Sequence, residues 1–435
     1  MLFHPLSPAM NSNIHLPGYE LWMTFIKNVY VIPRRLDHTR FQYALSKSVE
    51  LYSHVAGRIQ HHSGQWVLRL VNAPIPVEVE LSSHVELRGF VVQDHNVLAS
   101  FLSPQPTDDS LRSGNGPLLL IKLTISEDDS TAIGVCWHHV LGDATLFLRF
   151  MHTGVSQHYQ GLEPSFAKPT FAKHHFPHPD LEMVEEYKSF FPHLARQLSS
   201  SEIGSAYAES HGTITRTDWR VSRCKLESLL RAMDQLGSPL KLSLQDCLTA
   251  LVVVVLSKST LPIQKVMNAA SYRTVQASFV QPDVAGNAIL IIMTDKIEES
   301  EQRSIFAVAR KVRQSITQNL QPQRLEKLLS VASHLMLQAA NTETPPFFGS
   351  DPTTLSVNSN LRIDWTSAHF SSPGSARFYT SGFSRLYLRT FRSNPDAGNS
   401  TLEQDGIDVC LGVPKKLKSV ILQALDWELS SIPDS

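Results

Sequence analysis

The sequence has little of what marks a secreted, disulfide-bonded protein. Its 435 residues include only four cysteines. They are widely spaced and lie mostly in apolar stretches: Cys136, Cys224, Cys247 and Cys410. This pattern favours buried thiols in a reducing compartment over a disulfide framework. Because the N-terminal stretch also lacks the basic start and sustained apolar core of a signal peptide, we expect a cytoplasmic protein.

Long apolar runs and an excess of charge of either sign are also missing. The most apolar segment, residues 247–256, is too short to cross a bilayer, which needs about 20 residues. The 39 basic and 40 acidic residues give a net charge of -1, so no global field attracts nucleic acid or an anionic membrane. We therefore expect small-molecule partners and predict binding to neither nucleic acid nor membrane.

The signatures of several common enzyme classes are absent as well. There is no G-x-S-x-G, H-E-x-x-H, P-loop or Rossmann glycine fingerprint. A histidine group at His174, His175 and His178 could form a metal tract, but its proline-rich surroundings favour a solvated surface loop. We predict no metal site and no permanently bound cofactor.

The length of the chain, and the alternation of strand-like and helix-like patterns, predict two α/β domains. The first covers residues 1–180 and the second covers residues 213–435. A serine-rich crossover linker, 181–212, separates them. Predicted strands in the first part include 25–33, 117–126 and 130–137, with a helical pattern at 36–58.

One segment carries conflicting local signals. Residues 243–259 contain four consecutive valines, which favour a strand. Ser243 and Asp246 form a near capping box, which favours a helix that begins there. The run is long for a buried strand, so we predict a buried helix.

The segment VCWHHVLGDATL, residues 135–146, contains the main candidates for chemistry. An apolar strand-like run ends in His138 and His139, and Asp143 follows. One interpretation is a strand, a loop and a helix capped by Asp143. The other is a catalytic site, because histidine is the side chain best suited to move protons near neutral pH.

The sequence HHVLGDA resembles the H-x-x-x-D motif of the BAHD acyltransferases and the HHxxxDG motif of nonribosomal peptide condensation domains. Both belong to the chloramphenicol acetyltransferase-like superfamily. Further similar segments are 45–59, which ends near Ala56, Gly57 and Arg58, and 268–289, which carries Arg273, Gly286 and Asn287. The departures are Ala144, where the family often has glycine, and His369 to Gly374, a degenerate counterpart of D-F-G-W-G that keeps Phe370.

The resemblance implies an α/β fold of two chloramphenicol acetyltransferase-like domains with an active-site channel between them. It implies a monomeric acyltransferase (EC 2.3.1.-) that uses acyl-CoA as co-substrate. The expected reaction is O-acylation, with acetyl among the candidate groups, of a hydroxylated secondary metabolite such as a terpenoid or polyketide. An amine acceptor is the less favoured option. No motif identifies the residues that bind coenzyme A.

The resemblance also implies residue roles. His139 is the expected general base, and Asp143 is expected to pair with Arg273 and hold the histidine loop. His138 and Asn287 are supporting residues, with Asn287 fixing backbone near the domain interface. Two alternatives remain open: a condensation-type, amide-forming enzyme with a carrier-bound donor, and a non-catalytic binding paralogue.

Overall fold

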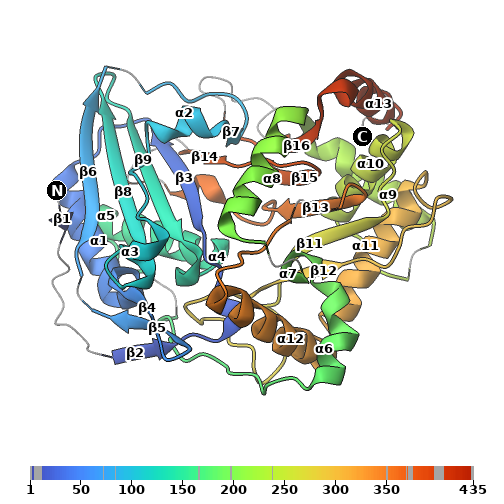
Figure 1. Cartoon of the computed structure of the whole chain (residues 1–435). Coiled ribbons are helices and arrows are strands. Elements are labelled where there is room, and N and C mark those ends of the chain that lie inside the picture. The colour runs from blue at the N-terminus through green and yellow to red at the C-terminus, as the bar shows by residue number, and fades with distance from the viewer. Residues whose placement is uncertain are drawn as a thin grey trace.

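The structure is a computed structural model that describes residues 2–3, 12–71, 73–83, 85–164, 167–195, 198–237, 239–348, 351–368, 370, 376–395 and 406–432. Two large β-sheets lie side by side, with helices packed against each (Figure 1). The first sheet is on the left of Figure 1 and the second is on the right, with the long helix α12 below them.

The first sheet, as far as the chain is described, has the order β1-β6-β8-β9-β3-β14-β7. Its strands are β1 (Leu2–Phe3), β3 (Phe25–Ile32), β6 (Ile75–Ser82), β7 (Val92–Gln93), β8 (Leu119–Ser126), β9 (Thr131–His138) and β14 (Arg377–Ser381). Every residue of β8 and β9 is buried, as expected for a central strand pair covered on both faces. The strands predicted at 25–33, 117–126 and 130–137 are confirmed.

Helices cover one face of this sheet. α1 (His38–Leu51) is capped by Asp37, whose carboxylate accepts the backbone N–H groups of Thr39 and Arg40. It packs along a helix that starts as α4 (Ala144–Leu148), passes through a π-helical turn (Arg149–Ser156) and ends as α5 (Gln157–Gln160). The shorter helices α2 (His95–Ala99) and α3 (Asp108–Arg112), and a small sheet of β2 (Ser12–His15), β5 (Gln65–Leu70) and β4 (Arg58–His62), complete this half.

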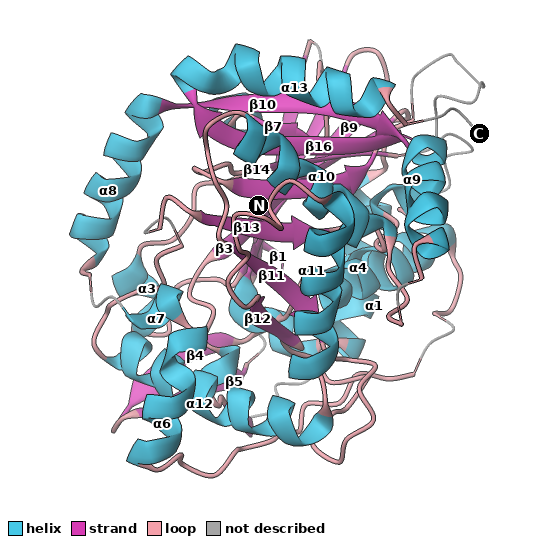
Figure 2. Cartoon of the chain, turned by 90° about the vertical axis from the view of Figure 1, so that its right-hand side faces the viewer, coloured by secondary structure: helices cyan, strands magenta, loops and turns pink. Residues whose placement is uncertain are grey.

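The second sheet has the order β10-β16-β15-β13-β11-β12 within the described residues. Its strands are β10 (Ile214–Ser222), β11 (Lys265–Ser271), β12 (Ile289–Met293), β13 (Thr354–Ser359), β15 (Tyr387–Arg392) and β16 (Gly406–Pro414). Its helices are α9 (Arg223–Gln235), α10 (Leu244–Lys258), α11 (Ile305–Asn319), α12 (Pro322–Asn341) and α13 (Lys418–Ser430). Figure 2 shows α10 and α11 in front of these strands.

The ambiguous valine-rich segment is a helix, as predicted. The Ser243 hydroxyl accepts the backbone N–H of Asp246, and the Asp246 carboxylate accepts the backbone N–H of Ser243. This reciprocal capping box satisfies two of the free N–H groups at the helix start. The valines are buried on all sides between α9, α11, α13 and the sheet, which outweighs their preference for strands.

The crossover between the halves has more structure than its composition indicates. Within the predicted linker the chain forms two short helices, α6 (Leu181–Tyr187) and α7 (Pro192–Ala195), which stay separate because Pro192 cannot continue a preceding helix. The serine-rich stretch forms α8 (Ser200–Thr213), which starts with a Ser199–Glu202 capping box. Only Ile203 of α8 is buried, so the sequence has little apolar periodicity there.

One strand crosses between the halves. β14 comes from the C-terminal part of the chain, yet it pairs with β3 and β7 in the first sheet. Phe378 and Tyr379 of β14 are buried there. The division into 1–180, 181–212 and 213–435 stays a prediction.

The burial of the cysteines agrees with the sequence prediction at three of the four positions. Cys136, Cys247 and Cys410 are buried, but the expectation is wrong for Cys224, which is exposed near the start of α9.

No helix in the described part of the chain combines the length and apolar character that a membrane span requires.

Candidate active site

The histidine motif lies where the central strand β9 leaves the first sheet. His138 ends the strand, and a short helical turn over His139–Leu141 follows. Gly142 then adopts φ 143°, a conformation that side chains disfavour, and a Cβ there would lie 2.4 Å from a Leu146 methyl carbon. This turn ends at Asp143, where α4 begins.

Asp143 caps a helix and also forms the ion pair with Arg273 that the resemblance implies. Its Oδ1 accepts the backbone N–H of Leu146 at 3.1 Å, which makes it the N-cap of α4. Its two oxygens also accept from Arg273, with Nη2 3.1 Å from Oδ1 and Nε 3.2 Å from Oδ2. Oδ2 further accepts the backbone N–H of Ala288 at 2.9 Å. The carboxylate is therefore fully occupied in holding the loop.

Arg273 connects this carboxylate to the second half of the molecule. Its guanidinium also donates to the backbone carbonyls of Pro282, Val284 and Gly286. The Asp143 and Arg273 side chains are only 3% and 7% exposed, respectively. A buried ion pair holds only when its remaining hydrogen-bonding atoms are satisfied, and the carbonyls supply that for the arginine.

The imidazole of His139 is oriented by Asn287. The Asn287 Nδ2 donates to the backbone carbonyl of His139 at 2.9 Å and to a Glu20 carboxylate oxygen at 3.1 Å. Since both partners can only accept, they fix which end of the amide carries nitrogen. The amide oxygen therefore faces Nδ1 of His139, at 2.8 Å, and must accept from it. His139 is thus the Nδ1–H tautomer, and no residue in the described part of the chain donates to the lone pair on its Nε2.

Glu20 and Lys173 form a buried ion pair behind this asparagine, and the sequence pattern did not indicate them. The Lys173 Nζ lies 2.7 Å from Glu20 Oε1, and the two side chains are 3% and 1% exposed. Lys173 also donates to the carbonyl of Ala285, while Glu20 accepts the backbone N–H of Asn287 at 2.8 Å. A lone acidic residue in the apolar stretch around Glu20 was the only signal in the sequence.

Gly286 is required by the close packing of this pair. A Cβ at Gly286 would lie 2.0 Å from Lys173 Nζ and 2.2 Å from Glu20 Oε1. Both distances are far below van der Waals contact. Because Gly286 has no Cβ, the charged side chains of Lys173 and Glu20 can approach the backbone next to Asn287.

Electrostatics keep His139 neutral. Burial lowers the pKa of the imidazole below its usual value, and the nearby Asp143, Asn287 and Glu20 oppose that shift only in part. A neutral imidazole with a free Nε2 can accept a proton at neutral pH. The Trp22 ring lies beside it, with ring centroids 5.7 Å apart.

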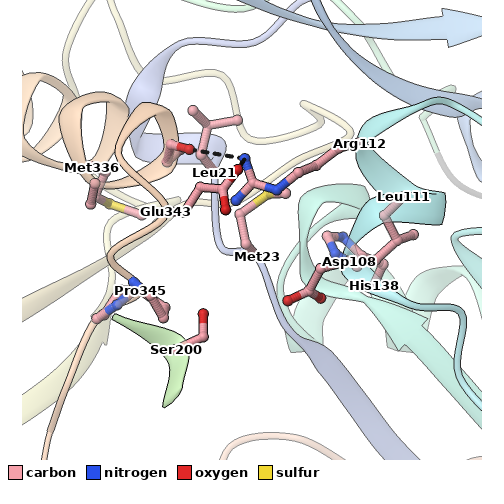
Figure 3. Close-up of a pocket in the computed structure, with 13 residues that line it drawn as sticks. Leu21, Met23, Asp108, Leu111, Arg112, His138, Ser200, Met336, Glu343 and Pro345 are labelled. Carbon is pink, nitrogen blue, oxygen red and sulfur yellow. Dashed lines mark hydrogen bonds and ion pairs between the residues drawn. The ribbon is translucent and has the colours of Figure 1, made fainter. Parts of the chain in front are cut away.

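His138 faces a different environment. Its Nδ1 accepts the backbone N–H of Val140 at 3.3 Å, and burial lowers its pKa to about 3. It lines a cavity of about 110 Å³ between α3, α12 and the start of β3, shown in Figure 3. Of the three cavities described, this is the largest, and none is lined by His139 itself.

Two sequence expectations fall on other parts of the chain. His369 and residues 371–374, most of the degenerate D-F-G-W-G counterpart, lie outside the described residues. Phe370 is described, and it is buried against Phe41 and Tyr159. Among the described residues, no group of three histidine, cysteine or acidic side chains converges as metal ligands do.

The fold, the motif loop and the buried Asp143–Arg273 pair define an acyltransferase of the chloramphenicol acetyltransferase-like class. The profile of the Transferase family matches residues 17–403, and the chain belongs to this family, that of the BAHD acyltransferases. A comparison with curated proteins found no match.

Several solved structures share the fold at low sequence identity. F. sporotrichioides TRI101, solved with coenzyme A and T-2, is 12% identical, with a TM-score of 0.66 over 96% of this chain and 98% of that chain. Vinorine synthase is 15% identical, with a TM-score of 0.65 over 100% and 97%. VibH, an NRPS condensation enzyme, is 14% identical, with a TM-score of 0.56 over 94% and 92%.

Replacing Asp143 tests the role of the ion pair. Asp143→Asn places an amide NH₂ against the Arg273 guanidinium or the Ala288 N–H, and leaves the buried cation without its counter-charge. We expect the free energy of unfolding to fall by about 3–5 kcal/mol, measured by denaturant titration. Arg149→Gln, which breaks the half-exposed Arg149–Asp283 pair, should cost about 1 kcal/mol or less. Equal losses in both variants would contradict the assignment.

Replacing Asn287 tests the positioning of His139. Asn287→Ala removes the acceptor of the Nδ1–H, so we expect kcat to fall roughly 10²-fold. The pH at which kcat/KM falls on the acid side, the acid limb of the pH profile, should also move to lower pH. The reason is that the Asn287 contact raises the pKa of His139. Asn319→Ala, at a buried asparagine on α11 bonded to Ser315 and Arg324, is the control. A loss of activity without a shift of the limb would indicate a purely structural role.

Proposed function

We propose that the protein is an acyl-CoA-dependent O-acyltransferase with His139 as its general base, acting on a hydroxylated secondary metabolite. The observation that carries the proposal is the tautomer of His139. The Asn287 amide fixes the hydrogen on Nδ1 and leaves Nε2 as the basic atom. Membership of the acyltransferase family supplies the reaction class.

In the proposed reaction, the alcohol and the thioester bind together. The alcohol oxygen attacks the carbonyl carbon of the thioester while Nε2 of His139 takes the hydroxyl proton. The tetrahedral intermediate then collapses, the bond from carbon to sulfur breaks, and the coenzyme A thiolate takes the proton from Nε2. The products are an ester and free coenzyme A, and no acyl-enzyme forms.

The roles of the other residues follow from their contacts. Asp143 is a positioning residue, because both its oxygens are engaged by Arg273 and by backbone N–H groups. Asn287 positions the imidazole, and Glu20 with Lys173 positions Asn287. His139 alone of this group has a free basic nitrogen.

The choice of substrate is supported by related structures. TRI101 has been solved with coenzyme A together with T-2, from F. sporotrichioides, or with deoxynivalenol, from F. graminearum. These are small-molecule alcohols, so a terpenoid or polyketide alcohol is our proposed acceptor, with acetyl as the first donor to test. A carrier-bound donor, as used by condensation enzymes, is the competing proposal because VibH shares the fold.

Release of free thiol from acetyl-CoA tests the function. Wild-type protein with a pool of hydroxylated metabolites should release coenzyme A faster than without the pool. His139→Ala should reduce the acceptor-dependent rate by about 10²–10⁴-fold. His95→Ala, at an exposed histidine on α2, should leave the rate unchanged.

The opposing outcomes are specific. Undiminished release by His139→Ala would move the chemistry to another residue. Release only from an acyl-phosphopantetheinyl carrier protein would establish the condensation-type reading. Binding of coenzyme A and alcohol without turnover in any combination would establish a binding paralogue.

The pH profile provides an independent prediction. Protonated His139 has no lone pair on Nε2, so kcat/KM falls as the pH drops through its pKa. Because burial lowers that pKa, the midpoint of the acid limb should lie below about 6.5, the value of free histidine. A steady-state pH series of kcat/KM locates this midpoint. A midpoint above 6.5 would contradict a buried neutral base.

A further inference from the structure

The two adjacent histidines of the motif have opposite tautomers. His139 donates through Nδ1 and keeps Nε2 as an acceptor. His138 accepts through Nδ1, because its partner there is the backbone N–H of Val140, which can only donate. Burial keeps His138 neutral, so its single ring hydrogen is on Nε2. His139 therefore offers a basic nitrogen, and His138 offers a hydrogen-bond donor.

The Nε2–H of His138 has no hydrogen-bond partner within the part of the chain that the structure describes. His138 is 1% exposed, yet it lines the largest cavity described. The Phe25 ring packs edge-to-face against the imidazole, with centroids 4.8 Å apart, and fixes its plane. The His138 Nε2 is not fully enclosed by protein atoms, so its N–H opens onto the cavity, where a ligand oxygen can accept from it.

The cavity has an apolar wall and a polar rim. Leu21, Met23 and Met336 are among the apolar side chains around it, and Figure 3 shows the His138 ring close to Asp108 and Leu111. Asp108 and Glu343 are exposed at the rim, where Arg112 lies 3.4 Å from Glu343. Two carboxylates and one guanidinium give the rim a negative balance.

This charge balance selects between the two substrates of the proposed reaction. Coenzyme A carries anionic phosphates, which a rim with two carboxylates would repel. A neutral or cationic molecule with an apolar skeleton fits the lining. The cavity lies next to the motif turn: His138, which lines it, directly precedes His139 in the chain, and Met336 lines both this cavity and a neighbouring one that Trp22 also lines.

We propose that this cavity is the subsite for the acyl acceptor, and that His138 is a specificity-determining residue whose Nε2–H donates to a carbonyl or ether oxygen of that molecule. The preferred acceptor is then a neutral or cationic alcohol that carries a second, hydrogen-bond-accepting oxygen on an apolar ring system. This proposal rests on the proposed function, because it assigns one of the two substrates to the cavity.

Two probes that differ in a single group test the contact. The probes are cyclohexanol and the cyclohexanone that carries a hydroxyl opposite its carbonyl, called the ketone below. Each is added to wild-type protein in which the histidine nitrogens are isotope-labelled, and the spectrum is followed by nuclear magnetic resonance. The expected spectrum shows His138 as the Nε2–H tautomer and His139 as the Nδ1–H tautomer. The ketone should move the His138 Nε2–H signal, and cyclohexanol should move it less. Equal shifts, no shift up to the solubility limit, or an Nδ1–H tautomer for His138 would overturn the proposal.

A matched pair of variants tests specificity. His138→Asn retains an oxygen near Nδ1 that can accept from Val140, but it cannot reach into the cavity. His138→Gln places an amide N–H near the position of Nε2. With acetyl-CoA as donor, the ratio of kcat/KM for the ketone over cyclohexanol should fall roughly threefold to tenfold in His138→Asn. It should be largely retained in His138→Gln. An unchanged ratio in His138→Asn would overturn the proposal.

The outcomes separate this proposal from the proposed function. The magnetic resonance experiment requires neither turnover nor a variant that folds. A ketone-specific shift without thiol release would keep the subsite and reject the transferase. Thiol release that depends on His139, without a ketone-specific shift, would keep the transferase and reject the subsite. A His138 shift with acetyl-CoA alone would assign the cavity to the pantetheine arm and overturn our assignment.

Discussion

The buried pair of Asp143 and Arg273 is the interaction on which the candidate site depends. A charged carboxylate and a guanidinium in a protein interior are costly unless all their hydrogen-bonding atoms are used. Here the carboxylate engages Leu146, Ala288 and Arg273, and the guanidinium also engages three backbone carbonyls. Because the two residues come from different halves of the chain, satisfying the pair fixes the two halves against each other at the histidine turn.

The orientation of His139 follows from this constraint. The Arg273 contacts with the carbonyls of residues 282–286 hold the loop that carries Asn287. Glu20 and Lys173 hold the same loop from the opposite side. The amide of Asn287 is then left with one arrangement of donors and acceptors, and that arrangement selects the tautomer of His139. The Asp143–Arg273 and Glu20–Lys173 ion pairs therefore both hold Asn287 in place. Asn287 in turn decides which ring nitrogen of His139 carries the hydrogen.

The contrast between His138 and His139 arises from local backbone geometry. The first residue ends an extended strand and the second begins a helical turn, so their rings lie in different surroundings. The first meets a backbone N–H and the second meets an amide oxygen. Since both rings are kept neutral by burial, each has one donor and one acceptor nitrogen, in opposite order. The two adjacent histidines thereby present different groups: His139 an acceptor Nε2, and His138 an Nε2–H donor.

The sequence by itself determined the local elements and the motif. Capping residues such as Ser243 and Asp246, and the apolar strands around residue 130, act through neighbours in the chain, so pattern reasoning predicts them. The family motif likewise pointed to His139, Asp143, Arg273 and Asn287. Only the tertiary structure decided that β14 joins the first sheet, that Glu20 and Lys173 lie behind Asn287, and that His138 faces a cavity. These depend on contacts between residues more than a hundred positions apart, which no local pattern encodes.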